Sequence, residues 1–377
     1  MRILFSSWPG YGHLFPMVPL VRAAERAGHE VLVSSGSDLA AATERLGVPF
    51  RSSGLTAAEG YAGVPDIGHS IDALPDEVKT AFAARHLFGP GALARARDLG
   101  EVLDEWRPDL VVHDTFELGA PSAAGERGVR HATHGYGPLL AENQAMVRAV
   151  AEVVADAGRE DPSGVLDAPY LDITPPGLRR DEHVAWADPR PLRPSAGEAD
   201  PDPDLEAALD ALPCARTVYL TLGTVMNRAP HVFGAVLAAS ATLGVNVVLT
   251  TGPDTDPSSV AGDADWVLAR PYLPQAVVLP RCDAVISHAG AGTMLGALCH
   301  GVPQLCLPLG TDQPLNAAAL APTGAGLVLV PEQISEAAVA DAVRLLLEDP
   351  SYAASAHRLR DEIDAMPAAD EVLAQLV

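Results

Sequence analysis

Hydrophobic residues in the first half of the chain fall in short continuous runs, and the segments between them carry apolar residues every three or four positions. Short runs predict buried strands, and the wider spacing predicts helices. The predicted strands are residues 2–7, 29–35, 48–52, 109–114 and 130–135, and the predicted helices are residues 14–28, 38–47 and 117–128. This alternation predicts a parallel sheet with helices on both faces.

The alternation starts again in the second half of the chain. Strands are predicted at residues 217–223, 245–252, 283–290, 303–310 and 326–331, and helices at residues 231–244, at 292–301 and from near residues 314 and 335. The pattern therefore predicts two doubly wound α/β domains. Ligands bind such sheets at the carboxyl ends of the strands.

Three segments depart from the alternation. Residues 55–90 are rich in Gly, Pro and His and predict a long loop region with short helices. Residues 188–204 are dense in Pro and Asp and predict a linker or surface excursion. Residues 350–377 predict two short helices broken near Pro367.

Composition limits the kinds of protein that fit. The 377 residues are 48% hydrophobic, which suits two globular domains. No apolar run reaches the ~18 residues of a membrane span, and the first residues lack a signal-peptide pattern, so we expect a cytoplasmic protein. The formal net charge of -24 argues against nucleic acids and anionic membranes as partners. The four cysteines form no C-x-x-C pair, which favours structural thiols.

The segment HAGAGT, residues 288–293, follows a predicted strand and opens a predicted helix. The first turn of a helix has unpaired N–H groups and a partial positive charge, and therefore receives anions. Gly223 and Thr224 end another strand of the same domain. Together these groups suit a diphosphate without a lysine. The alternative is an ordinary strand-to-helix turn, and the segment is not a P-loop because no G-K-[ST] follows.

The segment GTDQPLNA, residues 310–317, follows the next strand. Asp312 and Gln313 precede Pro314, which suits the first turn of a helix. Asp312 is therefore either a helix N-cap or, with Gln313, a pair that binds sugar hydroxyls. The sequence alone leaves both interpretations open.

His13 begins the helix after the first strand, where a neutral imidazole can take a proton near neutral pH. Asp114 ends a strand of the same predicted sheet and is a candidate partner for it. The alternative is a capping or packed histidine, and His113, His131 and His134 lie equally near strand ends. No H-E-x-x-H or clustered Cys/His spacing predicts a metal site.

Together these motifs resemble the nucleotide-sugar-dependent glycosyltransferases of the GT-B fold, above all the actinomycete enzymes that glycosylate antibiotics such as macrolides, enediynes and aromatic polyketides. The resemblance covers essentially the whole chain and is strongest over residues 216–331. It implies two Rossmann-like domains facing across a cleft. Residues 1–195 would bind the acceptor and residues 196–359 the nucleotide-sugar donor, and residues 360–377 would form a helix that crosses back to the first domain.

The resemblance also implies roles for individual residues. His13 looks like the base that deprotonates the acceptor, and Asp114 like the residue that orients it. The residues that look like the family's donor-diphosphate-binding groups are Gly223, Thr224, His288, Gly290, Gly292 and Thr293. The nucleotide base is expected at Tyr272, Leu273 and Gln275, and the donor sugar at Asp312 and Gln313.

The activity so implied is an inverting transfer of a sugar to a small-molecule natural product. The sugar is expected to be a deoxysugar carried on dTDP or UDP, with no cofactor and no metal requirement, since no D-x-D cluster lies at the donor turn. A homodimer is compatible with the resemblance. Relatives often carry an aromatic residue where this chain has Thr311, and glycine where it has Ala289, so the identity of the sugar stays open.

Other functions fit the predicted fold less well. A nicotinamide-dependent oxidoreductase should show G-x-G-x-x-G after the first strand, but Phe15 stands at the third glycine position. A nucleotide-sugar epimerase of the same fold remains an alternative. So does a non-catalytic nucleotide-sugar-binding partner of another glycosyltransferase, although such a partner would not need both His13 and Asp114.

Overall fold

Two parallel sheets organise the chain, and each belongs to its own unit. The computed structural model describes all residues except 66–73, 139, 180–185, 200, 224–228 and 253–254. The first unit comprises Met1–Thr174, Arg180–Leu192 and Pro367–Val377, and the second comprises Pro175–Arg179 and Arg193–Met366. The predicted domain boundaries lie at residues 195/196 and 359/360, and the corresponding divisions between the two units lie at 192/193 and 366/367.

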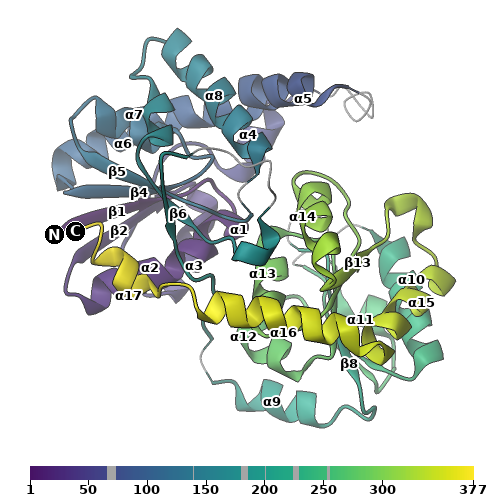
Figure 1. Cartoon of the computed structure of the whole chain (residues 1–377). Helices are drawn as coiled ribbons and strands as arrows, with labels where there is room; N and C mark the ends of the chain where they lie inside the picture. Colours follow the sequence, from purple (N-terminus) through teal and green to yellow (C-terminus); the bar gives the residue numbers. More distant parts are fainter. Residues whose placement is uncertain (66–73, 139, 180–185, 200, 224–228, 253–254) are drawn as a thin grey trace. The chain divides into compact units, whose positions relative to one another are not determined.

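The first unit contains a seven-stranded parallel sheet in the described residues, with the strand order β3-β2-β1-β4-β5-β6-β7 (Figure 1). Its strands are β1 Arg2–Ser6, β2 Glu30–Ser35, β3 Phe50–Ser52, β4 Leu110–Asp114, β5 Arg130–His134, β6 Pro169–Asp172 and β7 Asp188–Pro191. The predicted strands of this half all occur. The middle strands are buried on both faces, which explains why they are continuous apolar runs.

Helices cover this sheet. They are α1 Tyr11–Leu14, α2 Val18–Arg26, α3 Ala40–Arg45, α4 Ala57–Ala62, α5 Asp76–Ala83, α6 Gly89–Trp106, α7 Gly119–Gly125, α8 Ala141–Asp156 and α17 Ala369–Leu373. The long helix α6 was not predicted. Its Gly91 fits closely against the ring of Trp8, because a Cβ there would lie 2.5 Å from a ring carbon.

The interpretation of residues 188–204 as a linker is wrong at its start. Residues Asp188–Pro191 form β7, which pairs with β6 and is the edge strand of the sheet. Proline is tolerated in such a strand because one of its sides makes no ladder bonds. The next part of the segment leads into α9, Pro203–Asp210, where Asp202 caps the helix by accepting from the Leu205 N–H.

The last residues return to the first unit. α16 (Pro350–Asp364) belongs to the second unit, whereas α17 packs against α2. Asp370 of α17 pairs with Arg26 of α2 at 2.8 Å, and the carbonyl of Gln375 accepts from Arg190 of β7. Figure 1 shows this segment in yellow beside α2. The two predicted helices near Pro367 are therefore present.

The second unit repeats the design with six parallel strands in the described residues, in the order β10-β9-β8-β11-β12-β13. They are β8 Thr217–Thr221, β9 Asn246–Thr250, β10 Val267–Arg270, β11 Ala284–Ser287, β12 Gln304–Cys306 and β13 Gly326–Val328. The remaining helices are α10 Pro230–Leu243, α11 Pro257–Ala261, α12 Gln275–Val278, α13 Ala291–Cys299, α14 Gln313–Leu320 and α15 Glu336–Glu348. Buried apolar clusters lie on both faces of this sheet. Two doubly wound α/β domains are thereby confirmed.

Candidate active site

His13 and Asp114 meet at the point where the strand order of the first sheet reverses. β1 and β4 are neighbours in the sheet, yet the chain leaves β1 in one direction and reaches β4 only after building β2 and β3. Loops after two such strands diverge and leave a crevice for ligands. α1, after β1, carries His13, and Asp114 is the last residue of β4. The predicted contact is present: His13 Nδ1 lies 3.0 Å from Asp114 Oδ1.

The carboxylate of Asp114 is fully buried and held from several sides. Its Oδ1 also accepts from the Phe116 N–H at 2.9 Å, and its Oδ2 accepts from the Trp8 N–H. Burial alone would raise the pKa of the Asp114 carboxyl, but His13 and the two backbone donors hold that pKa below its usual value. Asp114 therefore stays ionised and fixed in place.

The ring of His13 is positioned by its neighbours. It stacks on Tyr136, with the ring centroids 4.7 Å apart and the planes at 22°, and Phe116 lies on another side at 6.5 Å. The bond from Nδ1 to the carboxylate orients the imidazole and leaves Nε2 as the nitrogen with a lone pair. The His13 side chain is 19% exposed, so a substrate can reach it.

The other histidines near these strand ends have a different character. His113 and His134 are fully buried, and burial lowers the pKa of His113 to about 3 and that of His134 to about 4. His113 bonds the Asp114 carbonyl and faces Thr133, and burial also lowers the pKa of His131. Burial thus separates His13 from His113 and His134, whereas His131 lies at the second residue of β5, away from the carboxyl end of that strand.

In the second unit, the order reverses between β8 and β11, and the HAGAGT segment directly follows β11. The His288 ring lies between two glycines. A Cβ would stand 2.7 Å from the ring at Gly223 and 2.5 Å from it at Gly290. Both glycines therefore make room for the imidazole. Thr224, predicted beside them, lies outside the described residues.

His288 carries an unsatisfied nitrogen. Its Nδ1 is buried and has no hydrogen-bond partner among the described residues. Burial lowers the pKa of His288, and the Thr221 carbonyl and the charge of Asp312 oppose this. A buried polar atom without a partner is costly in a folded protein.

The first turn of α13 provides the backbone donors. Gly290 is the N-cap residue, so the N–H groups of Ala291, Gly292 and Thr293 point out of the helix end without intrahelical partners. A Cβ on Gly292 would meet no atom within 4 Å. The Thr293 hydroxyl accepts from Gln275 Nε2 at 2.9 Å, which ties this turn to the start of α12.

The segment predicted to hold the nucleotide base runs from β10 into α12. Tyr272 is 66% exposed, whereas Leu273 is buried in the apolar cluster beneath the sheet. Leu273 can therefore offer only its backbone to a ligand. Gln275 is the first residue of α12 and bonds Thr293, so this segment and the diphosphate turn share a side-chain contact.

Asp312 does not act as a side-chain cap. Its N-cap position shows no side-chain cap hydrogen bond, and its carboxylate accepts from Thr311 Oγ1 at 3.0 Å and Asn316 Nδ2 at 2.7 Å. Gln313 is buried, and its amide oxygen accepts from the N–H groups of Leu309 and Gly310. Asp312 thus remains partly exposed in the loop after β12. Gln313 fixes the conformation of this loop through its bonds to Leu309 and Gly310.

Two residues of these sites were not predicted. Asn316 donates to the Ala289 carbonyl at 3.0 Å as well as to Asp312, and so joins the HAGAGT turn to the loop after β12. Its place one helical turn after Asp312 was the available signal. Tyr136, which stacks on His13, follows β5 by two residues.

Two features are absent from the described residues. These residues contain no group of three or more His, Cys, Asp or Glu side chains placed to hold a metal ion. None of their helices is long and apolar enough to cross a membrane.

The chain is similar to known proteins in both sequence and fold. The family model described as "Erythromycin biosynthesis protein CIII-like, C-terminal domain" matches residues 235–377. The L-demethylnoviosyl transferase of Streptomyces niveus is 32% identical over 376 residues, which cover 96% of this chain and 94% of that enzyme. The elloramycin glycosyltransferase ElmGT of Streptomyces olivaceus is also 32% identical, covering 100% of this chain and 97% of that one.

Solved structures show the same fold. The spinosyn rhamnosyltransferase SpnG is similar over 100% of both chains, with a TM-score of 0.81 and 26% identity. Its complex with thymidine diphosphate also covers both chains fully, with a TM-score of 0.78 and 25% identity. The chain therefore belongs to the actinomycete family of antibiotic-pathway glycosyltransferases, and it is a glycosyltransferase of the GT-B fold.

Proposed function

We propose that this glycosyltransferase moves a sugar, expected to be a deoxysugar, from a thymidine or uridine diphosphate sugar to a hydroxyl group of a small natural product, with inversion at the anomeric carbon. The observation that carries the proposal is the hydrogen bond of 3.0 Å between His13 and the buried Asp114 at the switch point of the first sheet. A base oriented by a carboxylate is what deprotonation of a hydroxyl requires.

In the proposed reaction, Nε2 of His13 takes the proton of the acceptor hydroxyl as its oxygen attacks the anomeric carbon. The new carbon–oxygen bond forms on the face opposite the bond to the diphosphate, which breaks, and the electron pair leaves with the nucleoside diphosphate. Asp114 stabilises the imidazolium that results. A base positioned in this way is typically worth ~10²–10⁴ in rate.

The donor is assigned to the carboxyl edge of the second sheet. The diphosphate is held by the first turn of α13 and its surroundings, namely Gly223, Thr224, His288, Gly290, Gly292 and Thr293. The unpartnered Nδ1 of His288 supports this assignment, because a phosphate oxygen would satisfy it. These neutral donors meet the charge that grows on the leaving group.

The nucleotide base is assigned to the exposed ring of Tyr272, the backbone of Leu273, and Gln275. A relative bound to thymidine diphosphate supports a thymidine nucleotide. The donor sugar is assigned to Asp312 and Gln313. Asp312 would accept from sugar hydroxyls, and Gln313 would act through the loop that it holds.

The test is release of nucleoside diphosphate when dTDP- and UDP-sugars are offered with a panel of aromatic and macrolactone acceptors, with and without EDTA. We expect turnover that persists in EDTA, and a product whose anomeric coupling constant in NMR shows inversion. His13→Ala should lower kcat by ~10²-fold or more and leave thymidine diphosphate binding intact. Full activity of His13→Ala would remove the base from the mechanism. Binding without transfer to any acceptor would instead favour a non-catalytic partner.

A further inference from the structure

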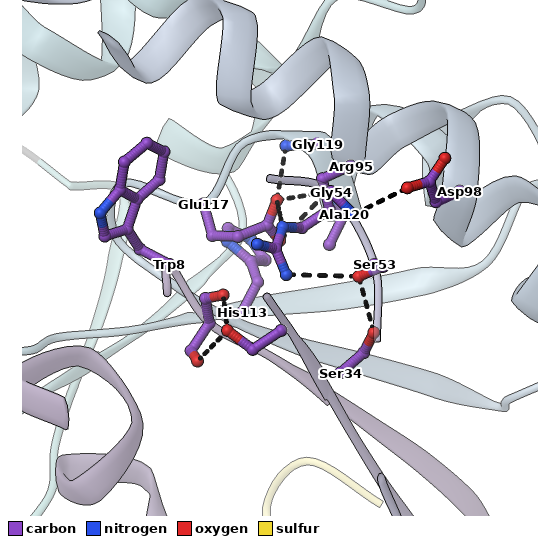
Figure 2. Close-up of polar contacts among 12 residues, drawn as sticks. Trp8, Ser34, Ser53, Gly54, Arg95, Asp98, His113, Glu117, Gly119 and Ala120 are labelled. Atoms are coloured by element: carbon purple, nitrogen blue, oxygen red, sulfur yellow. Dashed lines mark hydrogen bonds and ion pairs between the residues drawn. The ribbon is translucent and has the colours of Figure 1, made fainter. Parts of the chain in front are cut away.

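A buried ion pair lies behind the candidate base. Arg95 of α6 and Glu117, between β4 and α7, are 2% and 1% exposed, and Arg95 Nε lies 3.5 Å from Glu117 Oε1. Figure 2 shows Arg95 between Glu117 and Ser53, to which its guanidinium donates at 3.3 Å. A buried ion pair is weak evidence for stability, because desolvation of two charges offsets their attraction. Its presence therefore calls for another role.

The turn after β4 connects this pair to the base. The Glu117 N–H donates to the Asp114 carbonyl at 3.1 Å, so the two acidic residues are held three positions apart in one tight turn. The Glu117 carboxylate also accepts from the N–H groups of Gly119 and Ala120 and thereby fixes the start of α7 (Figure 2). The Asp114 carboxylate in the same turn bonds His13.

Charge balance then suggests what Glu117 does. Two carboxylates, Asp114 and Glu117, and one guanidinium, Arg95, are buried together. Burial lowers the pKa of the Arg95 guanidinium and raises the pKa of the Glu117 carboxyl, and the attraction between the two charges at 3.5 Å opposes both shifts. Without Glu117, the positive charge of Arg95 would be left facing Asp114, together with Asp38 and Asp98.

We infer that Glu117 is a positioning residue for the transfer reaction: it neutralises Arg95 and so leaves the negative charge of Asp114 to stabilise the proton that His13 takes from the acceptor. This inference rests on the proposed function of His13 as the base. Glu117, which lies three positions after Asp114, thereby controls how strongly the His13–Asp114 pair binds a proton.

Other titratable groups face this cluster from every side. Asp38, in the short 3-10 helix Ser37–Leu39 before α3, and Asp98 of α6 act on Arg95 as further negative charges. His113 of β4 and His134 of β5 face Asp114, and burial lowers the pKa of each so far that both are neutral near pH 7. Tyr170 of β6 is likewise buried and neutral, because burial raises its pKa. Only the charged groups can shift the proton affinity of His13.

The direction of the effect follows. Replacing Glu117 by Gln removes one negative charge near Asp114, which disfavours the imidazolium form of His13. The base then loses its proton at lower pH, so the acid limb of the pH profile of kcat/KM moves to lower pH. A weaker base also transfers the proton less readily, so the plateau rate falls.

The experiment compares the pH profile of kcat/KM in wild type and Glu117→Gln. Gln can still accept from the α7 N–H groups, so the hydrogen bonds at the start of that helix are preserved. We expect the acid limb to move down by about one pH unit, which corresponds to about 1.4 kcal/mol of lost stabilisation of the imidazolium. The double variant Arg95→Met with Glu117→Gln removes both charges and should return the limb to the wild-type position.

Glu101→Gln is the matched control, because it makes the same change at an exposed position of α6. It should not move the limb. If Glu117→Gln does not accumulate as folded protein, Asp98→Asn removes another charge that faces Arg95 and should give a smaller shift in the same direction. Lower rates at every pH without a moved limb in the folded variants, or a double variant that stays shifted, would overturn the inference.

A second readout separates this inference from the proposed function. The pH titration of the His13 ring by NMR, identified by the signal that His13→Gln lacks, does not require activity. Its midpoint should move down in Glu117→Gln and return in the double variant. If His13→Ala keeps full activity, the proposed base fails, while the NMR titration still tests whether Glu117 controls the charge at His13.

Discussion

The imidazole of His288 occupies the space that a Cβ atom on Gly223 would need. Such an atom would lie 2.7 Å from the ring, and Gly223 also has a φ of +72°, which L side chains rarely adopt. The glycine after β8 and the histidine after β11 are thus fitted to each other across the switch point of the second sheet. The conformation of the loop after β8 therefore sets the position of the His288 ring, the proposed hydrogen-bond donor to the diphosphate, in the loop after β11.

This fit predicts that Gly223→Ala displaces the His288 ring and weakens the binding of thymidine diphosphate. Loss of one hydrogen bond to a charged group is worth ~1.5–3 kcal/mol, or roughly 10–150-fold in Kd. Thymidine itself should bind almost unchanged, since the nucleoside is assigned to Tyr272. Isothermal titration with both ligands measures the difference.

Gly244→Ala is the matched control for strain. Gly244 ends α10 with a φ of +64°, but a Cβ there would meet nothing within 4 Å. Both variants should lose ~1 kcal/mol or more of stability from the left-handed backbone, and only Gly223→Ala should lose diphosphate affinity. Equal affinities in the two variants would show that the His288 ring is not part of the diphosphate site.

Asp114→Asn should lower stability as well as turnover. The carboxylate accepts at both oxygens, from Trp8, Phe116 and His13. An amide has only one oxygen, so either orientation places its NH₂ group against an N–H donor in a fully buried position. An unsatisfied buried group costs ~1–3 kcal/mol. Urea unfolding should show this loss, which His13→Ala, with a partly exposed side chain, should not share. A stable but slow Asp114→Asn would mean that the turn relaxes around the amide.

The buried histidines predict a loss of stability in mild acid. The folded-state pKa values are about 3 for His113 and about 4 for His134, below the ordinary value of 6.5. Below pH 6.5 the unfolded chain binds protons that the folded chain excludes. The free energy of unfolding should therefore fall as the pH drops from about 6.5 toward 4, and these groups should not affect it above about pH 7.5.

Each of the two histidines contributes about 1.4 kcal/mol per pH unit within that range. Urea titrations at pH 7.5, 6.0 and 5.0 measure the slope. His134→Gln should make it shallower, and His231→Gln, at an exposed position of α10, should leave it unchanged. A slope that His134→Gln does not alter would assign the acid sensitivity to other groups.

The sequence predicts the strands of both sheets where they are apolar on both faces, as in β1, β4, β8 and β11. It does not predict the short strands β6 and β10. It also does not predict β7, because Asp188–Pro191 has no apolar alternation and is a strand only through its pairing with β6. Helix α6 was missed for a related reason. It opens with glycine and proline, which have low helix propensity, and its Gly91 is explained by close packing against Trp8.

For the candidate site, chain order supplied the correct edge of each sheet but not the environment of each side chain. Position placed four histidines near strand ends, and only burial distinguishes His13 from His113 and His134. The contact of His13 with Asp114 was predictable because parallel strands bring their carboxyl ends together. The burial of Gln313 and the bond from Asn316 to Asp312 depend on loop backbone geometry, which no residue pattern encodes.

The return of residues 367–377 to the first unit has a consequence for biosynthesis. The ribosome delivers a chain from its N-terminus, and domains ordinarily fold in that order. Here the second unit, which ends at Met366, has all its residues before the first unit does. The surface of α2 that packs against α17, and that carries the Arg26 partner of Asp370, stays uncovered until residues 367–377 emerge. The unit made first is thus the one completed last, and the part of its surface that α17 covers stays exposed until residues 367–377 have emerged.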